Sequence, residues 1–209
     1  MICTVFAAMP AQDAVIPQDS FIIAADKGYV QLLQRGVVPD LTVGDFDSLG
    51  FVPQTDALVR HPVRKDDTDM MLAVREGLQR GFTRFLLYGG LGGRLDHTLA
   101  NIQTLAFLRD HGARGVLYGD GTAVTLLHNE SVRLPAKESG TLSVFSFGEK
   151  ADGVTERGLS FDAQDICVTN AFPIGVSNAF CGKEAEITVR NGTLLLLWEA
   201  SAAEAVRFI

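Results

Sequence analysis

The sequence predicts an α/β domain, with a mainly parallel sheet flanked by helices, followed by an all-β antiparallel sandwich domain. Along the first 120-odd residues, short apolar runs alternate with amphipathic stretches, a pattern typical of right-handed βαβ units. After about residue 122 the helical periodicity disappears, and residues 141–147 alternate apolar and polar side chains with a period of two. We therefore place the two domains at residues 1–122 and 123–209.

In the first domain, continuous apolar runs indicate strands that are buried on both faces. The expected strands are residues 2–7, 21–25, 41–43, 58–61, 85–88 and 116–118. Each expected helix closes at a glycine, the residue most favoured just beyond a helix end. The expected helices are residues 29–35, 70–80 and 96–111, which are followed by Gly36, Gly81 and Gly112.

In the second domain, alternating patterns indicate half-buried antiparallel strands. Residues 186–190 and 193–198 flank Asn191-Gly192, the strongest short-range signal for a β-hairpin. Residues 203–209 alternate again and predict a final strand. A small sandwich of two antiparallel sheets is the architecture we expect.

Composition restricts the function classes. The chain has 209 residues, of which 47% are hydrophobic, so it can bury a substantial core. Its net charge of −7 argues against binding to a nucleic-acid backbone. The start of the chain lacks the basic segment of a signal peptide, and no apolar run approaches the roughly 18 residues of a membrane span. The widely spaced Cys3, Cys167 and Cys181 indicate small apolar residues in a reducing compartment. We expect a cytoplasmic protein without nucleic-acid or membrane partners.

Five aspartates stand where expected strands end or the following helices begin. Asp26 follows the second strand, Asp45 and Asp47 follow the third, and Asp69 and Asp96 open the helices after the fourth and fifth. All should lie at the carboxyl edge of one parallel sheet, where open α/β sheets bind ligands. At an effective dielectric of about 20, two carboxylates about 4 Å apart repel by about 4 kcal/mol. A divalent cation, a cationic substrate or both would relieve that repulsion.

Structural roles compete with function at some of these positions. Asp26 could cap the next helix, and Asp69 could be a first-turn acid with Thr68 as the cap. Asp45 and Asp47, one residue apart after Gly44, favour metal ligation over a plain turn.

A glycine-rich loop at residues 89–93 lies between an expected strand and an expected helix, as anion-binding loops do. It matches neither the P-loop pattern nor the dinucleotide-binding pattern. Arg94 strengthens the phosphate interpretation because a guanidinium can bind a phosphate through two hydrogen bonds. His97 is more typical of a helix start, and residues 173–178 of an ordinary turn.

Taken together in this order, the motifs resemble those of the thiamine pyrophosphokinases over nearly the whole chain. They are Ala25-Asp26-Lys27-Gly28 with Pro39-Asp40 downstream, Gly44-Asp45-Phe46-Asp47-Ser48, Lys65-Asp66-Asp67-Thr68-Asp69, Gly89 to His97 and Gly175-Val176-Ser177-Asn178. Each motif alone is weak, but their succession is highly specific. The resemblance implies transfer of a diphosphoryl group from ATP to the hydroxyethyl group of thiamine, giving thiamine diphosphate and AMP. It also implies Mg²⁺ as cofactor, ATP and thiamine as substrates, and a homodimer.

The resemblance also implies roles for individual residues. The implied catalytic residues are Asp45, Asp47, Asp69 and Asp96, and the first three would hold Mg²⁺. The implied substrate-binding residues are Asp26, Lys65, Asp66, Thr68, Gly92, Arg94, Ser177 and Asn178. The partner's Ser177 and the partner's Asn178 would enclose thiamine. Lys27, where many members have glycine, would place a further cation near the phosphates, and Phe180 is the nearest counterpart of an aromatic residue that stacks on thiamine in some members.

Other functions use similar acid clusters. A Mg²⁺-dependent phosphohydrolase or another nucleotide kinase is one alternative, and a non-catalytic protein that binds thiamine or metal is the other. The glycine loop with Arg94 argues against the non-catalytic alternative, because a thiamine binder needs no phosphate site.

Overall fold

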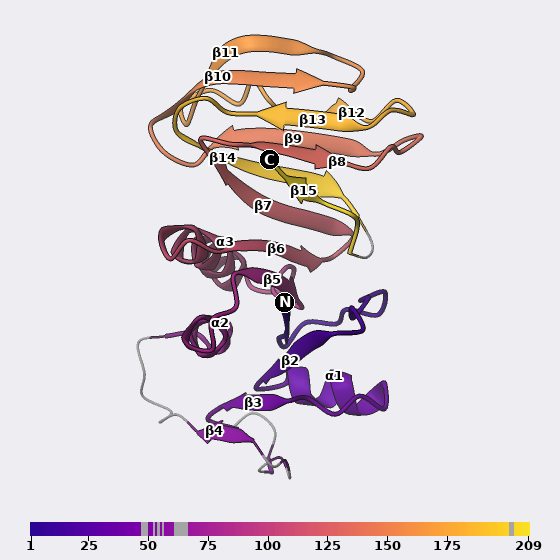
Figure 1. The fold of residues 1–209 in the computed structure, drawn as a ribbon, viewed down its shortest axis with the longest axis vertical. Helices are drawn as coiled ribbons and strands as arrows, with labels where there is room; N and C mark the ends of the chain where they lie inside the picture. The colour runs from indigo at the N-terminus through magenta and orange to yellow at the C-terminus, as the bar shows by residue number, and fades with distance from the viewer. Residues whose placement is uncertain (47–49, 52, 54, 56, 61–66, 201–202) are drawn as a thin grey trace. The chain divides into compact units, whose positions relative to one another are not determined.

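The computed structural model describes residues 1–46, 50–51, 53, 55, 57–60, 67–200 and 203–209. The chain forms two compact units, Met1–Gly121 and Thr122–Ile209. The first unit alternates strands and helices around a parallel sheet, and the second consists of antiparallel strands (Figure 1). The predicted fold class is confirmed.

The sheet of the first unit has the strand order β6-β5-β1-β2-β3-β4, with every neighbouring pair parallel. The strands are β1 (Ile2–Phe6), β2 (Ser20–Ala25), β3 (Leu41–Gly44), β4 (Leu58–Arg60), β5 (Arg84–Tyr88) and β6 (Arg114–Gly119). At the centre, Val5 of β1 stands opposite Ile23 of β2 and Leu87 of β5, and all three are fully buried. Apolar runs without polar alternation form these strands because both faces of a parallel sheet are covered.

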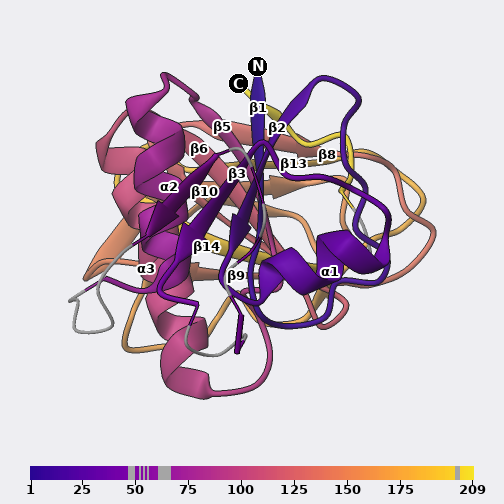
Figure 2. The ribbon, with the colours of Figure 1, turned by 90° about the horizontal axis from the view of Figure 1, so that it is seen from below.

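Helices cover both faces of this sheet. α1 (Gly28–Gln34) packs on β1 and β2, whereas α2 (Asp69–Gln79) packs on β1 to β3 and on α3 (Leu95–Asp110), which lies over β6. Figure 2 shows α1 on one side of the strands and the α2–α3 pair on the other. Each helix begins and ends one residue earlier than predicted, because the residue before the closing glycine is the C-cap. In the described residues, no helix is both long and apolar enough to cross a membrane.

The segment between β1 and β2 contains no helix and is held by side chains of α1. Gln31 donates from Nε2 to the carbonyl oxygen of Met9 at 2.7 Å and accepts from the Ala11 N–H at 3.0 Å. Arg35, just beyond α1, donates to the carbonyl oxygen of Ala14 at 3.2 Å. These bonds replace the missing main-chain pairing and fix the loop at the end of β1.

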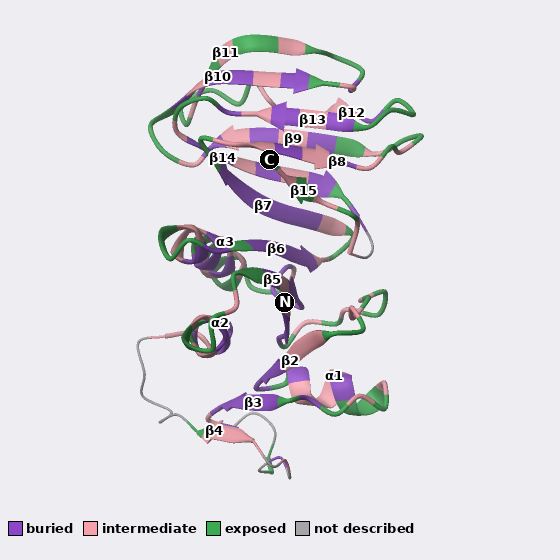
Figure 3. Cartoon of the chain, viewed as in Figure 1, coloured by how far each residue is buried: buried purple, intermediate pink, exposed green. Residues whose placement is uncertain are grey.

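The second unit has two antiparallel sheets, ordered β12-β9-β14-β7 and β11-β10-β13-β8-β15. The strands are β7 (Thr122–His128), β8 (Ser131–Leu134), β9 (Thr141–Ser146), β10 (Lys150–Arg157), β11 (Ala163–Thr169), β12 (Asn178–Ala179), β13 (Ala185–Thr188), β14 (Thr193–Glu199) and β15 (Arg207–Phe208). Buried residues recur at every second position of β9, as the period-two pattern predicts, and Figure 3 shows the same alternation along several strands.

The predicted hairpin at Asn191-Gly192 is wrong. β13 and β14, which these residues connect, belong to different sheets. Asn191 exchanges main-chain hydrogen bonds of 2.7 and 3.0 Å with Asp152, and the Gly192 N–H donates to Oδ1 of Asn129 at 2.8 Å. An Asn-Gly pair supplies the positive φ that a two-residue turn needs, but a crossover between sheets uses it equally well, here with φ of 106° at Gly192. The predicted last strand is also shorter, since it spans only Arg207–Phe208, after which Ile209 exchanges main-chain hydrogen bonds with Ser131.

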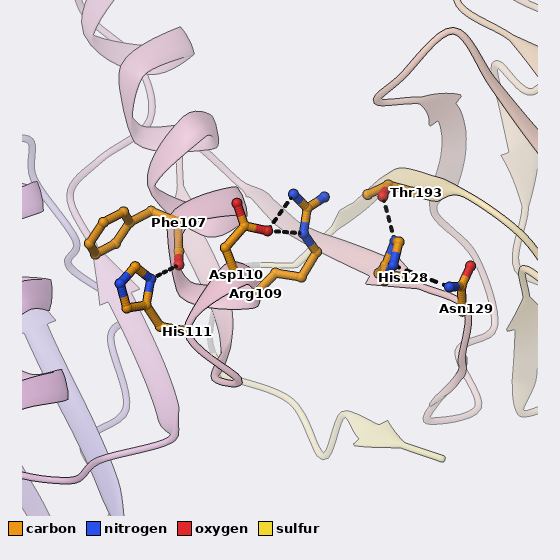
Figure 4. A network of polar contacts seen from close by, with 7 residues as sticks. All are labelled: Phe107, Arg109, Asp110, His111, His128, Asn129 and Thr193. Atoms are coloured by element: carbon orange, nitrogen blue, oxygen red, sulfur yellow. Dashed lines mark hydrogen bonds and ion pairs between the residues drawn. The ribbon is translucent and has the colours of Figure 1, made fainter.

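Two histidines have structural partners (Figure 4). In the second unit, Asn129 Nδ2 lies 3.1 Å from Nε2 of His128, and Nδ1 of that ring lies 2.8 Å from Oγ1 of Thr193. Because the amide nitrogen of Asn129 can only donate, the His128 ring accepts at Nε2 and donates from Nδ1. In the first unit, His111 donates from Nδ1 to the carbonyl oxygen of Phe107 at 2.8 Å, which closes α3.

The three cysteines are free thiols. Cys3 lies in the core, where burial raises the pKa of its thiol to about 12. Cys167 and Cys181 are exposed, so only Cys3 packs as a small apolar residue in the core.

The start of α1 provides a test of the packing. A Cβ added at Gly28 would lie 1.8 Å from the carbonyl oxygen of Phe6, so α1 and β1 would have to separate. We expect Gly28→Ala to lower the free energy of unfolding by about 3 kcal/mol in urea titrations. Gly36→Ala is the control, because its φ is +67° but no atom lies within 4 Å, and it should cost about 1 kcal/mol. Equal losses in the two variants would contradict the packing argument.

Candidate active site

A cavity of about 760 Å³ lies at the carboxyl edge of the parallel sheet. The loops that follow β1, β2 and β5 line it, together with the first turns of α2 and α3. β1 is the point at which the strand order reverses, since β2 to β4 lie on one side of it and β5 and β6 on the other. Open α/β sheets bind their ligands at such a reversal, so the fold itself marks this cavity as the candidate site.

Side chains of both charges line the cavity. The acids are Asp26, Asp67 and Asp69, and the cations are Lys27 and Arg94. Asp26 is only 8% exposed, whereas Lys27 and Arg94 are exposed. A site with this composition can hold a polyanion together with a cation.

The loop after β2 is in direct contact with the end of β3. The Asp26 N–H donates to the carbonyl oxygen of Val43 at 2.8 Å, and a Cβ added at Gly44 would lie 3.3 Å from the Cα of Asp26. Asp45 therefore follows immediately on a residue that touches Asp26, although Asp45 does not itself line the cavity. Phe46 is 3% exposed with φ of 65°, so its buried ring holds a strained backbone beside Asp45. The predicted metal ligand Asp47 lies outside the described residues.

The first turn of α2 supplies two of the predicted residues. Oγ1 of Thr68 accepts the Met71 N–H at 3.2 Å, so Thr68 is the N-cap and the capping interpretation is confirmed. Asp69 is the first residue of the helix and lines the cavity. Asp67, to which sequence reasoning assigned no role, also lines it and pairs with Arg75 at 3.4 Å. Lys65 and Asp66 lie outside the described residues.

The carboxylates fit a hard divalent cation by their chemistry. Asp26, Asp67 and Asp69 offer oxygen ligands of the kind that Mg²⁺ prefers. Within the described ranges, no group of three or more His, Cys, Asp or Glu residues has the geometry to hold a metal ion.

At the start of α3, Asp96 is tied to Arg94. Nε and Nη2 of Arg94 donate to the two oxygens of Asp96 at 3.1 and 2.6 Å. The hydrogen bond from the guanidinium holds the pKa of Asp96 below its usual range. Arg94 and His97 line the cavity together with Gly92, whereas Asp96 does not. The geometry thus places Asp96 beside a cavity residue, and its catalytic role stays a prediction.

Asn101 is a cavity residue that sequence reasoning missed. It is 8% exposed, and its Nδ2 donates to the carbonyl oxygen of Gly90 at 2.7 Å. It lies four residues after His97, so the two share one face of α3, and Arg94 is the N-cap residue just before that helix. That helical spacing is the signal that could have found it.

Ser177 and Asn178 lie in the second unit. The Asn178 amide clamps the main chain of Phe161, since Oδ1 accepts the Phe161 N–H at 3.1 Å and Nδ2 donates to its carbonyl oxygen at 2.7 Å. Ser177 has φ of 62°, and its N–H donates to Oγ of Ser143 at 3.0 Å. Phe180 is 3% exposed with Nζ of Lys137 5.1 Å from its ring centre, so its ring is not available for stacking on a ligand.

The side chain of Asn178 is hydrogen-bonded to a buried acid. Glu156 is 3% exposed, and its Oε2 accepts from Nδ2 of Asn178 at 2.9 Å. Burial raises the pKa of the Glu156 carboxyl, and the hydrogen bond from Asn178 opposes that effect.

A cavity with these glycines, cations and acids at a strand reversal is typical of enzymes that bind phosphorylated nucleotides. Comparison with known proteins narrows this class. Residues 13–117 match the family model described as thiamin pyrophosphokinase, catalytic domain, and residues 129–194 match thiamin pyrophosphokinase, vitamin B1 binding domain. The chain belongs to the thiamin pyrophosphokinase family, so the resemblance inferred from the motifs is confirmed.

Individual relatives agree. The thiamine pyrophosphokinase of Bacillus subtilis (strain 168) is 26% identical over 189 residues, which cover 84% of this chain and 85% of the relative. The solved structure of the Bacillus subtilis thiamine pyrophosphokinase superposes with a TM-score of 0.85 at 22% identity, covering 96% of this chain and 99% of the other. For the thiamin pyrophosphokinase of Geobacillus thermodenitrificans the TM-score is 0.81 at 20% identity, with 96% and 98% covered. These structures share the fold.

Glu156 makes the stability of the second unit depend on pH. A carboxyl whose pKa is raised by folding stabilises the protein below its unfolded pKa, and this contribution is lost as pH rises through the folded pKa. Glu156→Gln keeps an acceptor for Asn178 and removes the buried charge. We expect it to raise the urea midpoint at pH 8, with the difference from the parent protein vanishing near pH 4. A constant difference across this range would refute the prediction.

Proposed function

We propose that the cavity of the first unit binds ATP with Mg²⁺ and that the second unit binds thiamine. As a thiamin pyrophosphokinase family member, the chain is a thiamine diphosphokinase, which transfers the diphosphoryl group of ATP to the hydroxyethyl group of thiamine. The observation that carries the assignment of the cavity is its mixed lining. Arg94 and Lys27 can bind phosphate oxygens, Asp69 can contribute to a divalent-cation site, and the charges of Asp26 and Asp67 can attract a cationic substrate.

Phosphoryl transfer asks for in-line positioning and for neutralisation of charge on the phosphate oxygens. In our proposal Asp45, Asp47 and Asp69 would hold Mg²⁺, which would supply positive charge to neutralise the phosphate oxygens. Arg94 and the main-chain N–H groups of Gly92 and Gly93 bind the remaining phosphate oxygens.

The transfer itself replaces one phosphorus–oxygen bond by another. The hydroxyl oxygen of thiamine attacks the β-phosphorus of ATP. The bond from the β-phosphorus to the oxygen that bridges it to the α-phosphorus breaks, and AMP leaves with that oxygen. The hydroxyl proton passes to a carboxylate. We assign this role to Asp69, since the Thr68 cap fixes the first turn of α2 at the wall of the cavity.

Asp96 acts in this scheme by holding Arg94. Its two hydrogen bonds orient the guanidinium from one side. Lys65, Asp66 and Thr68 complete the proposed nucleotide site from the segment before α2.

We further propose a homodimer in which the partner's Ser177 and the partner's Asn178 help to enclose thiamine. Large apolar side chains that are about half or more exposed surround this motif in sequence and support a covered surface, namely Phe161, Phe172, Ile174 and Val176. Because the Asn178 amide is committed to Phe161 and Glu156, Asn178 acts through the loop that it holds, and Ser177 acts through its hydroxyl. The proposed location is the cytoplasm, which supplies ATP and keeps thiols such as Cys167 and Cys181 reduced.

Phosphorus NMR of the protein with MgATP and thiamine tests the reaction. We expect AMP and thiamine diphosphate as the products. ADP with a monophosphate would indicate an ordinary kinase, inorganic phosphate alone a phosphohydrolase, and binding without turnover a non-catalytic protein. Each of these three results would overturn the proposed reaction.

The metal assignment predicts the effect of neutralising single carboxylates. Asp45→Asn or Asp47→Asn should lower kcat about 100-fold or more, because charge neutralisation in the transition state is lost, with little change in the urea midpoint. Asp40→Asn is the matched control, since Asp40 precedes β3 at the opposite edge of the sheet and accepts the Ile22 N–H at 2.7 Å. Near-normal turnover of either site variant at saturating Mg²⁺ would sink the assignment.

A further inference from the structure

The peptide groups at the start of the glycine turn are held by their carbonyl oxygens. The oxygen of Gly89 accepts the Met9 N–H at 3.1 Å, and the oxygen of Gly90 accepts Nδ2 of Asn101 at 2.7 Å. The C=O and N–H of a trans peptide point in opposite directions. Fixing these two oxygens therefore also fixes the directions of the N–H groups of Gly90 and Leu91.

The second half of the turn has main-chain N–H groups that can bind an anion. Gly92 and Gly93 line the cavity, with φ of 82° and 68°. Within the described part of the chain, their N–H groups donate to no main-chain carbonyl. Successive N–H groups in such a conformation form a concave site for an anion.

A turn of this composition needs an external constraint. Peptides flanked by glycine rotate at little steric cost, and a rotated peptide would present a carbonyl oxygen where an anion requires a donor. The Gly89 oxygen is held by the main-chain N–H of Met9, which side-chain substitutions other than proline leave in place. The Gly90 oxygen is held by one side chain, that of Asn101. A substitution of Asn101 can therefore remove this hydrogen bond.

Asn101 is itself held rigidly. It is 8% exposed on α3, whose later residues Leu105 and Leu108 are buried in the core. Its amide also lies against Gly90 so closely that a Cβ added there would be 3.1 Å from Nδ2. Because the buried amide donates to the loop and not to its own helix, its hydrogen bond fixes the conformation of that loop.

We propose that Asn101 is a positioning residue for the phosphates of ATP. It keeps the Gly90–Leu91 peptide in the orientation that leaves the N–H groups of the turn directed at the ligand. This inference rests on the proposed function, since it assumes that ATP phosphates occupy the turn. It assigns a role in nucleotide binding to a residue that does not touch the reacting atoms.

Calorimetric titration with MgATP, together with steady-state kinetics, tests this role. Asn101→Leu keeps the volume and removes the donor, and Asn101→Ser keeps polarity but is too short to reach Gly90. Both should weaken MgATP binding about 10-fold, which corresponds to about 1.4 kcal/mol. The KM for ATP should rise in step, while the KM for thiamine stays within about twofold. Having two variants keeps the test decisive if one of them does not fold.

Thr104→Val is the matched control. Thr104 is a fully buried polar residue on the same helix, one turn further along, and its hydroxyl donates to the carbonyl oxygen of Ala100 at 3.1 Å. This variant should lose stability without any change in MgATP affinity. Unchanged MgATP affinity in a folded Asn101 variant, or equal losses for ATP and thiamine, would overturn the positioning role. In either case the products made by the parent protein would still decide the proposed reaction.

Discussion

The close approach of main chains at the carboxyl edge of the parallel sheet is the constraint on which the site depends. α1 begins against the carbonyl oxygen of Phe6, with no room for a side chain at Gly28. The loop after β2 hydrogen-bonds to the end of β3 through the Asp26 N–H. Because these segments are in contact through backbone atoms, side chains that are far apart in sequence are brought to one cavity by the packing of the main chain. The positions of the charged groups follow from this packing.

Those charged groups bring both signs of charge to one cavity. Asp26, Asp67 and Asp69 face the same cavity as Lys27 and Arg94. Arg94 already has a carboxylate partner in Asp96, so part of its charge is balanced before any phosphate arrives. Without a metal, a polyphosphate would be repelled by the carboxylates. Without a phosphate, a metal ion would be repelled by the cationic side chains. This balance of charges favours the proposed pair of ligands, a polyphosphate together with a divalent cation, over either ligand alone.

Much of this organisation could be predicted from the sequence, and the failures have physical causes. Asp26 and Asp69 could be placed at the cavity because a parallel sheet gathers the carboxyl ends of its strands at one edge, whereas Asp45 and Asp96 lie beside residues of the site without lining the cavity. The Asn191-Gly192 connection was misassigned because its local chemistry suits several chain paths, and distant pairing with Asp152 and Asn129 selects one. Asn101 was missed because its spacing from His97 does not reveal its hydrogen-bond partner, Gly90, which only the fold brings beside it. Likewise, only tertiary structure shows that Asn178 holds the backbone of Phe161.

The segment that follows β1 links the rim of the cavity to the smallest helix of the first unit. Gln31 and Arg35 bind several of its main-chain groups, and Met9 of the same segment bonds to the glycine turn. Local opening of α1 would therefore release the rim as well, so the two form one cooperative unit of structure. A nucleotide bound in the cavity stabilises this unit by mass action. The main-chain amides of α1, which need not touch the ligand, would then exchange their hydrogens with solvent more slowly when the site is filled.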